Sequence, residues 1–337
     1  MKGKSILILF AAMVVLGAFA VDVEASACRN PGSLLLFPYY NTVGANALSV
    51  ITITNTGSED VWIRIVWIPE DTCYPMDAWV YLTHKDTLTF LDQEFFAGTS
   101  RGFLYAYVVQ NNYSIAEEDY DYLIGQELVL YPQPQGNNQI VAWGINAVSF
   151  QALSIGPADG NLQLDGDEYT LAPKSLYFPR FLGQPDIGVP NPYVFSHMIL
   201  INLTGGTFFE ATANVWVFND NEVGKSDFIK FPCWHMLPLN EFSEWTQNKK
   251  LLGTDHDLDE PIGLTGFNIE TGWITMTGQQ ATNIYMSHFI DDASIYAVLL
   301  ETVGASTWAA ADLPFQTEDS QYSNGMLWST RTDGGDN

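Results

Sequence analysis

Three alternating carboxylates, Asp255, Asp257 and Asp259, are spaced like the first three ligands of a calcium-binding loop. A hard divalent cation needs several closely placed oxygen ligands, and this alternation supplies them. The rest of the EF-hand pattern is missing, because Glu260 stands in place of the turn glycine and Gly266 in place of the bidentate glutamate. We therefore expect a solvated acidic loop, with calcium as the one cofactor to consider.

Two serine–histidine neighbours, Ser196-His197 and Ser287-His288, suggest a nucleophile beside its base. Such catalysis requires a hydrogen bond between the two side chains, whereas adjacent residues of a strand point to opposite faces. Neither serine lies in a G-x-S-x-G turn, and the sequence contains no H-E-x-x-H, paired C-x-x-C, Walker or G-x-G-x-x-G signature. The sequence thus predicts no catalytic residue. A hydrolase whose residues converge only in the fold remains an alternative.

Aromatic side chains are abundant, with ten tryptophans and sixteen tyrosines. Exposed rings of this kind build the stacking platforms of carbohydrate-binding sandwiches. Most aromatic residues of β proteins instead pack in the core or on a sheet face. A carbohydrate-binding module is therefore kept as an alternative function.

Residues 1–27 have the pattern of a signal peptide. Lys2 and Lys4 precede an apolar run, and small residues then satisfy an A-x-A cleavage rule, so that cutting can follow Ala20 or Ala27. We favour Ala27. A membrane anchor fits less well, because the run is shorter than the ~20 residues that span a bilayer. We expect an extracytoplasmic protein, in the periplasm, on the cell surface or secreted, with no integral membrane span after processing.

Three cysteines, Cys28, Cys73 and Cys233, allow one disulfide and one remaining thiol in an exported chain. The sequence does not choose the pair. Cys28 directly follows the favoured cleavage site, so a lipid could be attached to it. The preceding Ala25-Ser26-Ala27, however, lacks the large aliphatic residue expected three places before a lipidated cysteine.

The chain is strongly acidic, with 39 Asp and Glu against 13 Lys and Arg and a net charge of -26. Nucleic acids and anionic membrane surfaces repel such a protein, so we expect no nucleic-acid partner. Solubility is the simplest reason for the acidity. Calcium and cationic partners remain as other reasons.

Short runs rich in Val, Ile, Thr and aromatic residues recur between turn signals, which is typical of an all-β sandwich or barrel. In the first half, the expected strands are 33–37, 47–55, 61–68, 78–82, 102–109, 127–131 and 140–153.

Several blocks of the first half recur in the second half in the same order, as a duplication predicts. Phe37-Pro38 matches Phe178-Pro179, and the segment 53–57 resembles the segment 201–205. Val66-Trp67 matches Val215-Trp216, and Phe150-Gln151-Ala152 aligns loosely with Tyr296-Ala297-Val298. Gly102-Phe103 against Gly272-Trp273 breaks the near-constant spacing, which implies an insertion in the second copy.

We therefore expect two tandem Ig-like β-sandwich domains, at residues 28–155 and 175–315. Residues 156–174 are rich in Gly, Pro and Asp and are expected to form an acidic linker. Its Asp159, Asn161, Asp165 and Asp167 offer a second and weaker group of calcium ligands. Residues 316–337 become polar and are expected to form a flexible tail.

Six blocks of the first half resemble a group of uncharacterised secreted bacterial proteins. These blocks are Leu34 to Asn41 (LLLFPYYN), Ser49 to Gly57 (SVITITNTG), Tyr81 to Leu88 (YLTHKDTL), Arg101 to Tyr107 (RGFLYAY), Leu123 to Val129 (LIGQELV) and Asn146 to Ala152 (NAVSFQA). The resemblance covers residues 33 to 153. It implies export and a bacterial source, and it brings no activity or site residue.

Together these patterns favour an exported, non-enzymatic protein with a structural, adhesive or binding role. Its sandwich domains would present loops or edge strands to an unknown protein or glycan partner.

Overall fold

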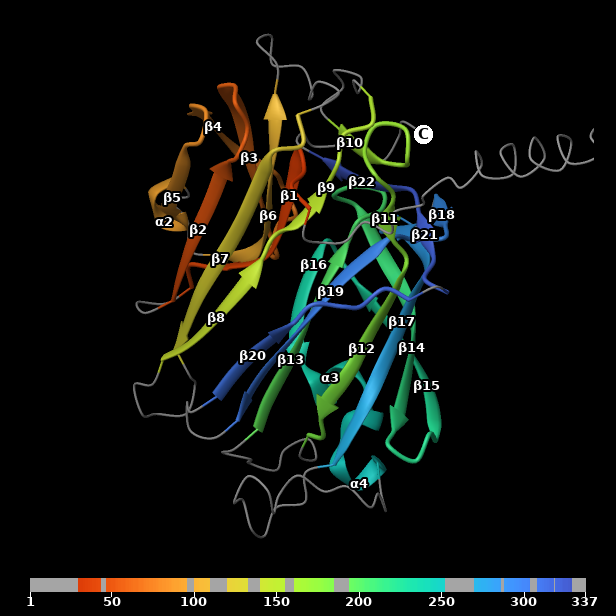
Figure 1. The fold of residues 1–337 in the computed structure, drawn as a ribbon. Helices are drawn as coiled ribbons and strands as arrows, with labels where there is room; N and C mark the ends of the chain where they lie inside the picture. The colour runs from red at the N-terminus through yellow and green to blue at the C-terminus, as the bar shows by residue number, and fades with distance from the viewer. Residues whose placement is uncertain are drawn as a thin grey trace, which may run out of the picture.

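The structure is a computed structural model that describes most of the chain. The described residues are 30–43, 47–95, 100–109, 120–132, 140–154, 161–184, 194–251, 270–285, 288–303, 308–317 and 319–328. Within these ranges the fold is nearly all β, as the sequence predicts, and every pairing between its strands is antiparallel (Figure 1). None of the helices in these ranges is both long and apolar enough to cross a membrane.

The first half of the chain forms two sheets. One has the order β4 (Met76–Leu82), β3 (Val61–Pro69), β6 (Arg101–Val109), β1 (Leu34–Asn41) and β9 (Val148–Phe150). The other has the order β5 (Thr87–Leu91), β2 (Leu48–Asn55), β7 (Leu123–Pro132) and β8 (Ile140–Asn146), and the short helix α2 (Asp92–Phe95) follows β5.

The second half forms two further sheets. One has the order β12 (Ser175–Leu182), β17 (Thr271–Asn283), β14 (Phe209–Asn219) and β15 (Gly224–Phe231), with β18 (Phe289–Asp291) added to β17. The other has the order β16 (Trp234–Pro238), β13 (Val194–Asn202), β19 (Ile295–Val303) and β20 (Trp308–Asp312). Three short helical turns, α3 (Leu239–Phe242), η2 (Glu244–Thr246) and α4 (Asn248–Leu251), lie between β16 and β17.

The two halves share their strand order, and they share an irregularity. The register of β1 against β6 shifts between Phe37 and Tyr40, and that of β12 against β17 shifts between Phe178 and Phe181. Both shifts lie at the two Phe-Pro matches, where proline removes a donor from the ladder.

A glycine on β6 and one on β17 occupy corresponding places. A Cβ on Gly102 would lie 2.0 Å from the carbonyl oxygen of Ile68, and one on Gly272 would lie 2.2 Å from that of Phe218. Neither position has room for a side chain, because the neighbouring strand passes too close.

The match of Val66-Trp67 with Val215-Trp216 is wrong by one residue. Gly102 lies opposite Pro69 and Gly272 opposite Asn219, so Trp67 corresponds to Val217 rather than to Trp216. A slip of one residue changes the face of the sheet: Trp67 is 1% exposed and Trp216 is 47% exposed.

Phe150 and Tyr296 are not equivalent either. Phe150 ends the edge strand β9, which pairs with β1, whereas Tyr296 lies on β19, which pairs with β13 and β20. Residues 140–153, expected as one strand, are two strands in different sheets.

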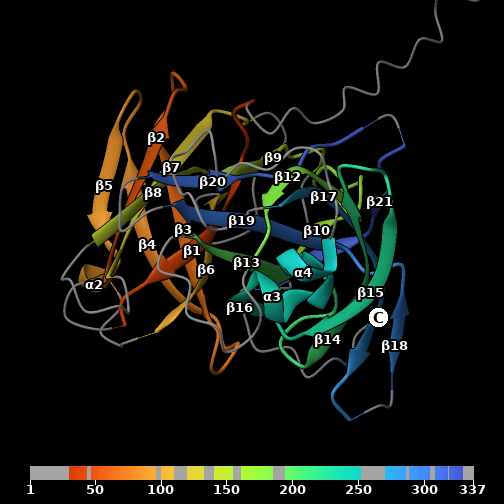
Figure 2. The ribbon, with the colours of Figure 1, turned by 90° about the horizontal axis from the view of Figure 1, so that it is seen from below.

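The hydrophobic core runs through both halves without a break. The Trp234 indole N–H donates a hydrogen bond to the Pro38 carbonyl over 2.9 Å, and its ring stacks on Tyr39 with 5.7 Å between centroids. The strands β8 and β20 lie side by side (Figures 1 and 2). The halves are therefore packed together.

Strands also form within the segments 156–174 and 316–337, which composition predicts as linker and tail. In these segments β10 (Asn161–Leu164) pairs with β22 (Gly325–Trp328), and β11 (Ala172–Pro173) pairs with β21 (Tyr322–Ser323). Although composition predicts a polar linker, Leu162 and Leu164 alternate with polar residues along β10, and both leucine side chains are buried. The described part of both segments is therefore integral to the fold.

Candidate binding pocket

A pocket lies where the chain crosses from one sheet of the first half to the other. β8 pairs with β7 as far as Asn146 opposite Gln126. After Ala147 the chain continues as β9, which pairs with β1 in the other sheet. The Ala147 N–H donates to the Gly125 carbonyl over 3.0 Å and so fixes the crossing point.

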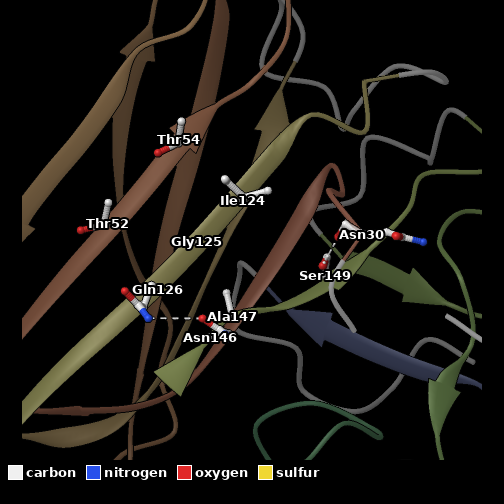
Figure 3. A pocket seen from close by; sticks show the side chains of 9 residues that line it. All are labelled: Asn30, Thr52, Thr54, Ile124, Gly125, Gln126, Asn146, Ala147 and Ser149. Atoms are coloured by element: carbon white, nitrogen blue, oxygen red, sulfur yellow. Dashed lines mark hydrogen bonds between the residues drawn. The ribbon is translucent and has the colours of Figure 1, made fainter. Parts of the chain in front are cut away.

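The pocket has a volume of about 380 Å³. Nine residues from β2, β7, the β8–β9 crossing and the start of the described chain line it (Figure 3): Asn30, Thr52, Thr54, Ile124, Gly125, Gln126, Asn146, Ala147 and Ser149. Strand alternation explains why Thr52 and Thr54 of β2 line the pocket: both lie on the outer face of the sheet, while Ile51 and Ile53 are buried.

Hydrogen bonds hold several of the polar side chains in place. The Gln126 Nε2 donates to the Asn146 Oδ1 over 3.3 Å, and the Ser149 hydroxyl donates to the Asn30 carbonyl over 2.5 Å (Figure 3). The hydroxyls of Thr52 and Thr54 bond to Thr89 and Thr87 of β5, over 3.2 and 3.0 Å. The lining is therefore partly preorganised, which reduces the entropy lost when a ligand binds.

Gly125 allows β7 to lie against the core at this point. A Cβ here would come within 2.6 Å of the Phe37 Cζ atom, so the position has no room for a side chain. Its neighbours Ile124 and Gln126 project to the other face of the strand, where they line the pocket.

None of the nine lining residues carries an ionisable side chain, although the chain has a net charge of -26. The pocket offers amide and hydroxyl groups beside the apolar side chains of Ile124 and Ala147. General acid–base catalysis needs a titratable group near the reacting atoms, and the lining provides none. The arrangement suits the binding of an uncharged ligand with hydrogen-bonding groups.

The sequence-based candidates lie elsewhere. Asp255, Asp257 and Asp259 fall outside the described residues, as does Cys28. Cys73 and Cys233 form a disulfide with their Cα atoms 5.9 Å apart, which answers the pairing that the sequence left open. Within the described parts of the chain, no three His, Cys, Asp or Glu side chains are grouped to hold a metal ion.

In the second acidic group, Asp165 serves a turn. Its Oδ1 accepts hydrogen bonds from the backbone N–H groups of Asp167 and Glu168, over 2.9 and 3.0 Å. This is the common role of an aspartate in a turn. Asp159 of the same group lies outside the described residues.

The Ser196-His197 pair has structural surroundings. The Ser196 hydroxyl accepts a hydrogen bond from the Gln184 Nε2 over 3.0 Å and lies 3.4 Å from the Glu301 Oε1. Burial lowers the pKa of His197 to about 4, so this imidazole is neutral at pH 7. Of the other pair, Ser287 lies outside the described residues.

Reasoning from sequence did not single out the pocket residues. Thr52, Thr54, Ile124 and Gln126 read as the outer face of ordinary strands, and only the crossing at Ala147 turns that face into a hollow. An asparagine within the run 140–153, at position 146, is the one local sign that the strand stops there.

Comparisons with known proteins assign no family. No family model matches the chain, and a search of curated proteins finds no match. Among solved structures, a crystal structure of Thermotoga maritima 1070 is 18% identical, with a TM-score of 0.28 over 36% of this chain and 96% of that chain. An apo Pleurotus ostreatus lectin is 9% identical, with a TM-score of 0.16 over 93% of this chain and 89% of that one.

Proposed function

We propose that the chain is an exported, non-enzymatic binding protein that holds an uncharged ligand, or an uncharged segment of a partner, in the pocket between β2, β7 and β8. The absence of ionisable side chains among its nine lining residues carries this proposal. Since 39 of the 337 residues are Asp or Glu, about one acidic side chain would be expected among nine residues of a surface with no particular role. An uncharged lining favours hydrogen bonding and apolar contact over ionic attraction.

The proposal includes an architecture of two tandem Ig-like sandwich units that arose by duplication. The shared strand order of the two halves supports it, as do the register shifts at Phe37 and Phe178 and the closely packed Gly102 and Gly272. In this account the second unit makes a shorter crossing after β20, where Phe315 forms a single antiparallel bridge with Tyr177 of β12 in the described part of the chain. The three-residue strand β9 that borders the pocket belongs to the first unit.

A glycan is the ligand class with the most specific support at this site. Its hydroxyl groups both donate and accept hydrogen bonds, as do the amides of Gln126 and Asn146 and the hydroxyl of Ser149. A hydrolase is less well supported, because its acid and base would have to come from outside the lining.

Binding to an immobilised panel of neutral glycans and uncharged peptides tests the proposal. We expect at least one neutral probe to bind, and the variant Q126A/N146A to bind it about tenfold more weakly, because two amides that hydrogen-bond the ligand are removed. The matched control is Q321A, which removes an exposed amide away from the pocket.

Two results would contradict the proposal. One is no binding to any neutral probe at millimolar concentration. The other is binding that Q126A/N146A leaves unchanged, which would place the site elsewhere.

A further inference from the structure

The outer face of the sheet β17–β14–β15 exposes several aromatic rings. Trp216 on β14 is 47% exposed and Phe228 on β15 is 71% exposed. Asn214 pairs with Phe228 and Trp216 pairs with Ser226, so the pleat places all four side chains on one face. Large exposed apolar side chains that gather on one face commonly mark a binding site.

Three of the rings form a parallel stack. The rings of Phe218 and Trp273 lie 4.1 Å apart with an interplanar angle of 6°, and those of Trp216 and Phe218 lie 6.2 Å apart at 22°. Gly224 lies opposite Phe218, and a Cβ there would come within 2.6 Å of the Phe218 ring. The stack is therefore set in place by the sheet, with Trp216 as its end member.

The residues between the rings are polar and uncharged. The register places Ser226 and Thr275 on either side of Trp216, and Thr277 beside Asn214. The nearest charged groups are the Lys230–Glu210 pair, joined over 2.5 Å, at one end and the exposed Asp220 and Glu222 of the β14–β15 turn at the other end. Between these ends, aromatic rings alternate with uncharged hydroxyl and amide groups.

We propose that this face binds a neutral glycan, with a sugar ring stacked on Trp216. The C–H face of a sugar ring is attracted to the electron-rich face of an aromatic ring, and its hydroxyl rim needs hydrogen-bonding groups beside that ring. Trp216 with Ser226, Thr275 and Asn214 supplies both. A protein partner is a poorer match, because the core of a protein interface is contiguous and apolar.

This site is separate from the pocket. It belongs to the second half of the chain, and it stands on its own aromatic and polar residues. Either proposal can fail while the other holds.

The test is affinity electrophoresis of the full chain through gels that contain soluble neutral polysaccharides, together with co-sedimentation with cellulose and chitin. We expect retention by at least one of these probes. The substitution W216A should weaken it about tenfold, and F228A should weaken it less, because Trp216 ends the ring stack and provides the stacking face. Thermal unfolding of each variant shows whether it folds.

Trp62 provides the matched control. It is an exposed tryptophan of the first half, 42% exposed, whose ring lies 5.2 Å from that of Tyr81. Charged groups surround it, because Tyr81 donates to Asp60 and Arg64 pairs with Asp77. W62A should therefore retain native affinity. Retention that W216A weakens should persist in the pocket variant Q126A/N146A, whereas retention that only Q126A/N146A weakens belongs to the pocket.

Three outcomes would overturn the proposal. In the first, the native chain is retained by none of the neutral polysaccharides. In the second, a folded W216A is retained as strongly as the native chain. In the third, sedimentation shows that W216A converts a dimer into a monomer, which would make a second copy of the chain the occupant of this face.

Discussion

Cys73 of the first half is bonded to Cys233 of the second half, across a sequence separation of 160 residues. Polar contacts surround this link. Glu70 pairs with Arg101 over 2.5 Å and with the Nδ1 of His235 over 3.2 Å, and the Arg101 guanidinium lies 5.7 Å from the Trp234 ring centroid. The junction between the halves is therefore held by a covalent bond, by the Glu70–His235 hydrogen bond, by the contact of Arg101 with the Trp234 ring and by the continuous core.

Removal of the disulfide should destabilise the whole chain. Closing so long a loop restricts the unfolded state, which on the chain-entropy estimate stabilises the fold by about 4–5 kcal/mol. We expect C73S/C233S to lower the free energy of unfolding by several kcal/mol, as measured by urea denaturation. The control C28S should leave it nearly unchanged. Equal stability of C73S/C233S and the native chain would show that the bond adds nothing.

The contribution of two buried carboxyl groups to stability should fall as the pH rises from 4 to 7, whereas that of His197, whose pKa is lowered by burial, rises over the same range. Asp92 is fully buried, with its Oδ1 accepting a hydrogen bond from the Trp67 indole over 3.0 Å. Burial raises the pKa of Asp92 from 3.8 to about 7, and burial also raises the pKa of Glu127 well above its usual range. Between the ordinary pKa that each carboxyl group has in the unfolded state and its raised pKa in the folded state, the folded state keeps a proton that the unfolded state releases. Raising the pH through this interval therefore favours unfolding.

The substitution D92N should reduce this pH dependence. Asparagine keeps the acceptor for Trp67 and removes the buried charge, so the variant should be more stable than the native chain at pH 8, by up to about 4 kcal/mol. Urea denaturation at pH 4.5 and pH 8 measures the difference. The control D77N changes a partly exposed pair with Arg64 and should shift stability by less than about 1 kcal/mol. A D92N variant with native pH dependence would refute the role of Asp92.

Gly125 and Gly144 provide a matched pair of glycines on neighbouring strands. G125A should destabilise the fold by about 1–3 kcal/mol, because its Cβ would come within 2.6 Å of the Phe37 ring. G144A should be neutral or slightly stabilising, since the nearest atom to its Cβ is 4.0 Å away. Thermal unfolding midpoints of the two variants check this. Equal midpoints would mean that Phe37 moves aside at little cost.

Residue patterns predict much of this fold, because local β propensity and turn signals are strong. The Phe37-Pro38 and Phe178-Pro179 match identifies equivalent strands, since proline and the register shift leave a recognisable mark. The match of Val66-Trp67 with Val215-Trp216 fails by one residue, because alternation is too weak where both faces of a strand are apolar. The pairing of β10 with β22 depends on contacts between distant segments that composition does not reveal.

The sequence does not predict the pocket either, because the pocket also depends on contacts between segments that are distant in the chain. Its polar residues are ordinary members of strand faces, and their convergence depends on where the chain changes sheet at Ala147. Cys73 and Cys233 were correct candidates without a predicted pairing, because their proximity is a property of how the two halves pack.

The most direct test of the proposed function is an NMR titration of the chain with the neutral probe that binds best. We predict saturable shifts in the side-chain amide signals of Gln126 and Asn146, with an affinity that changes by less than about twofold between about 0.05 and 0.5 M salt, because the lining carries no charge. Shifts confined to residues outside the pocket, or an affinity that collapses at high salt, would contradict the account.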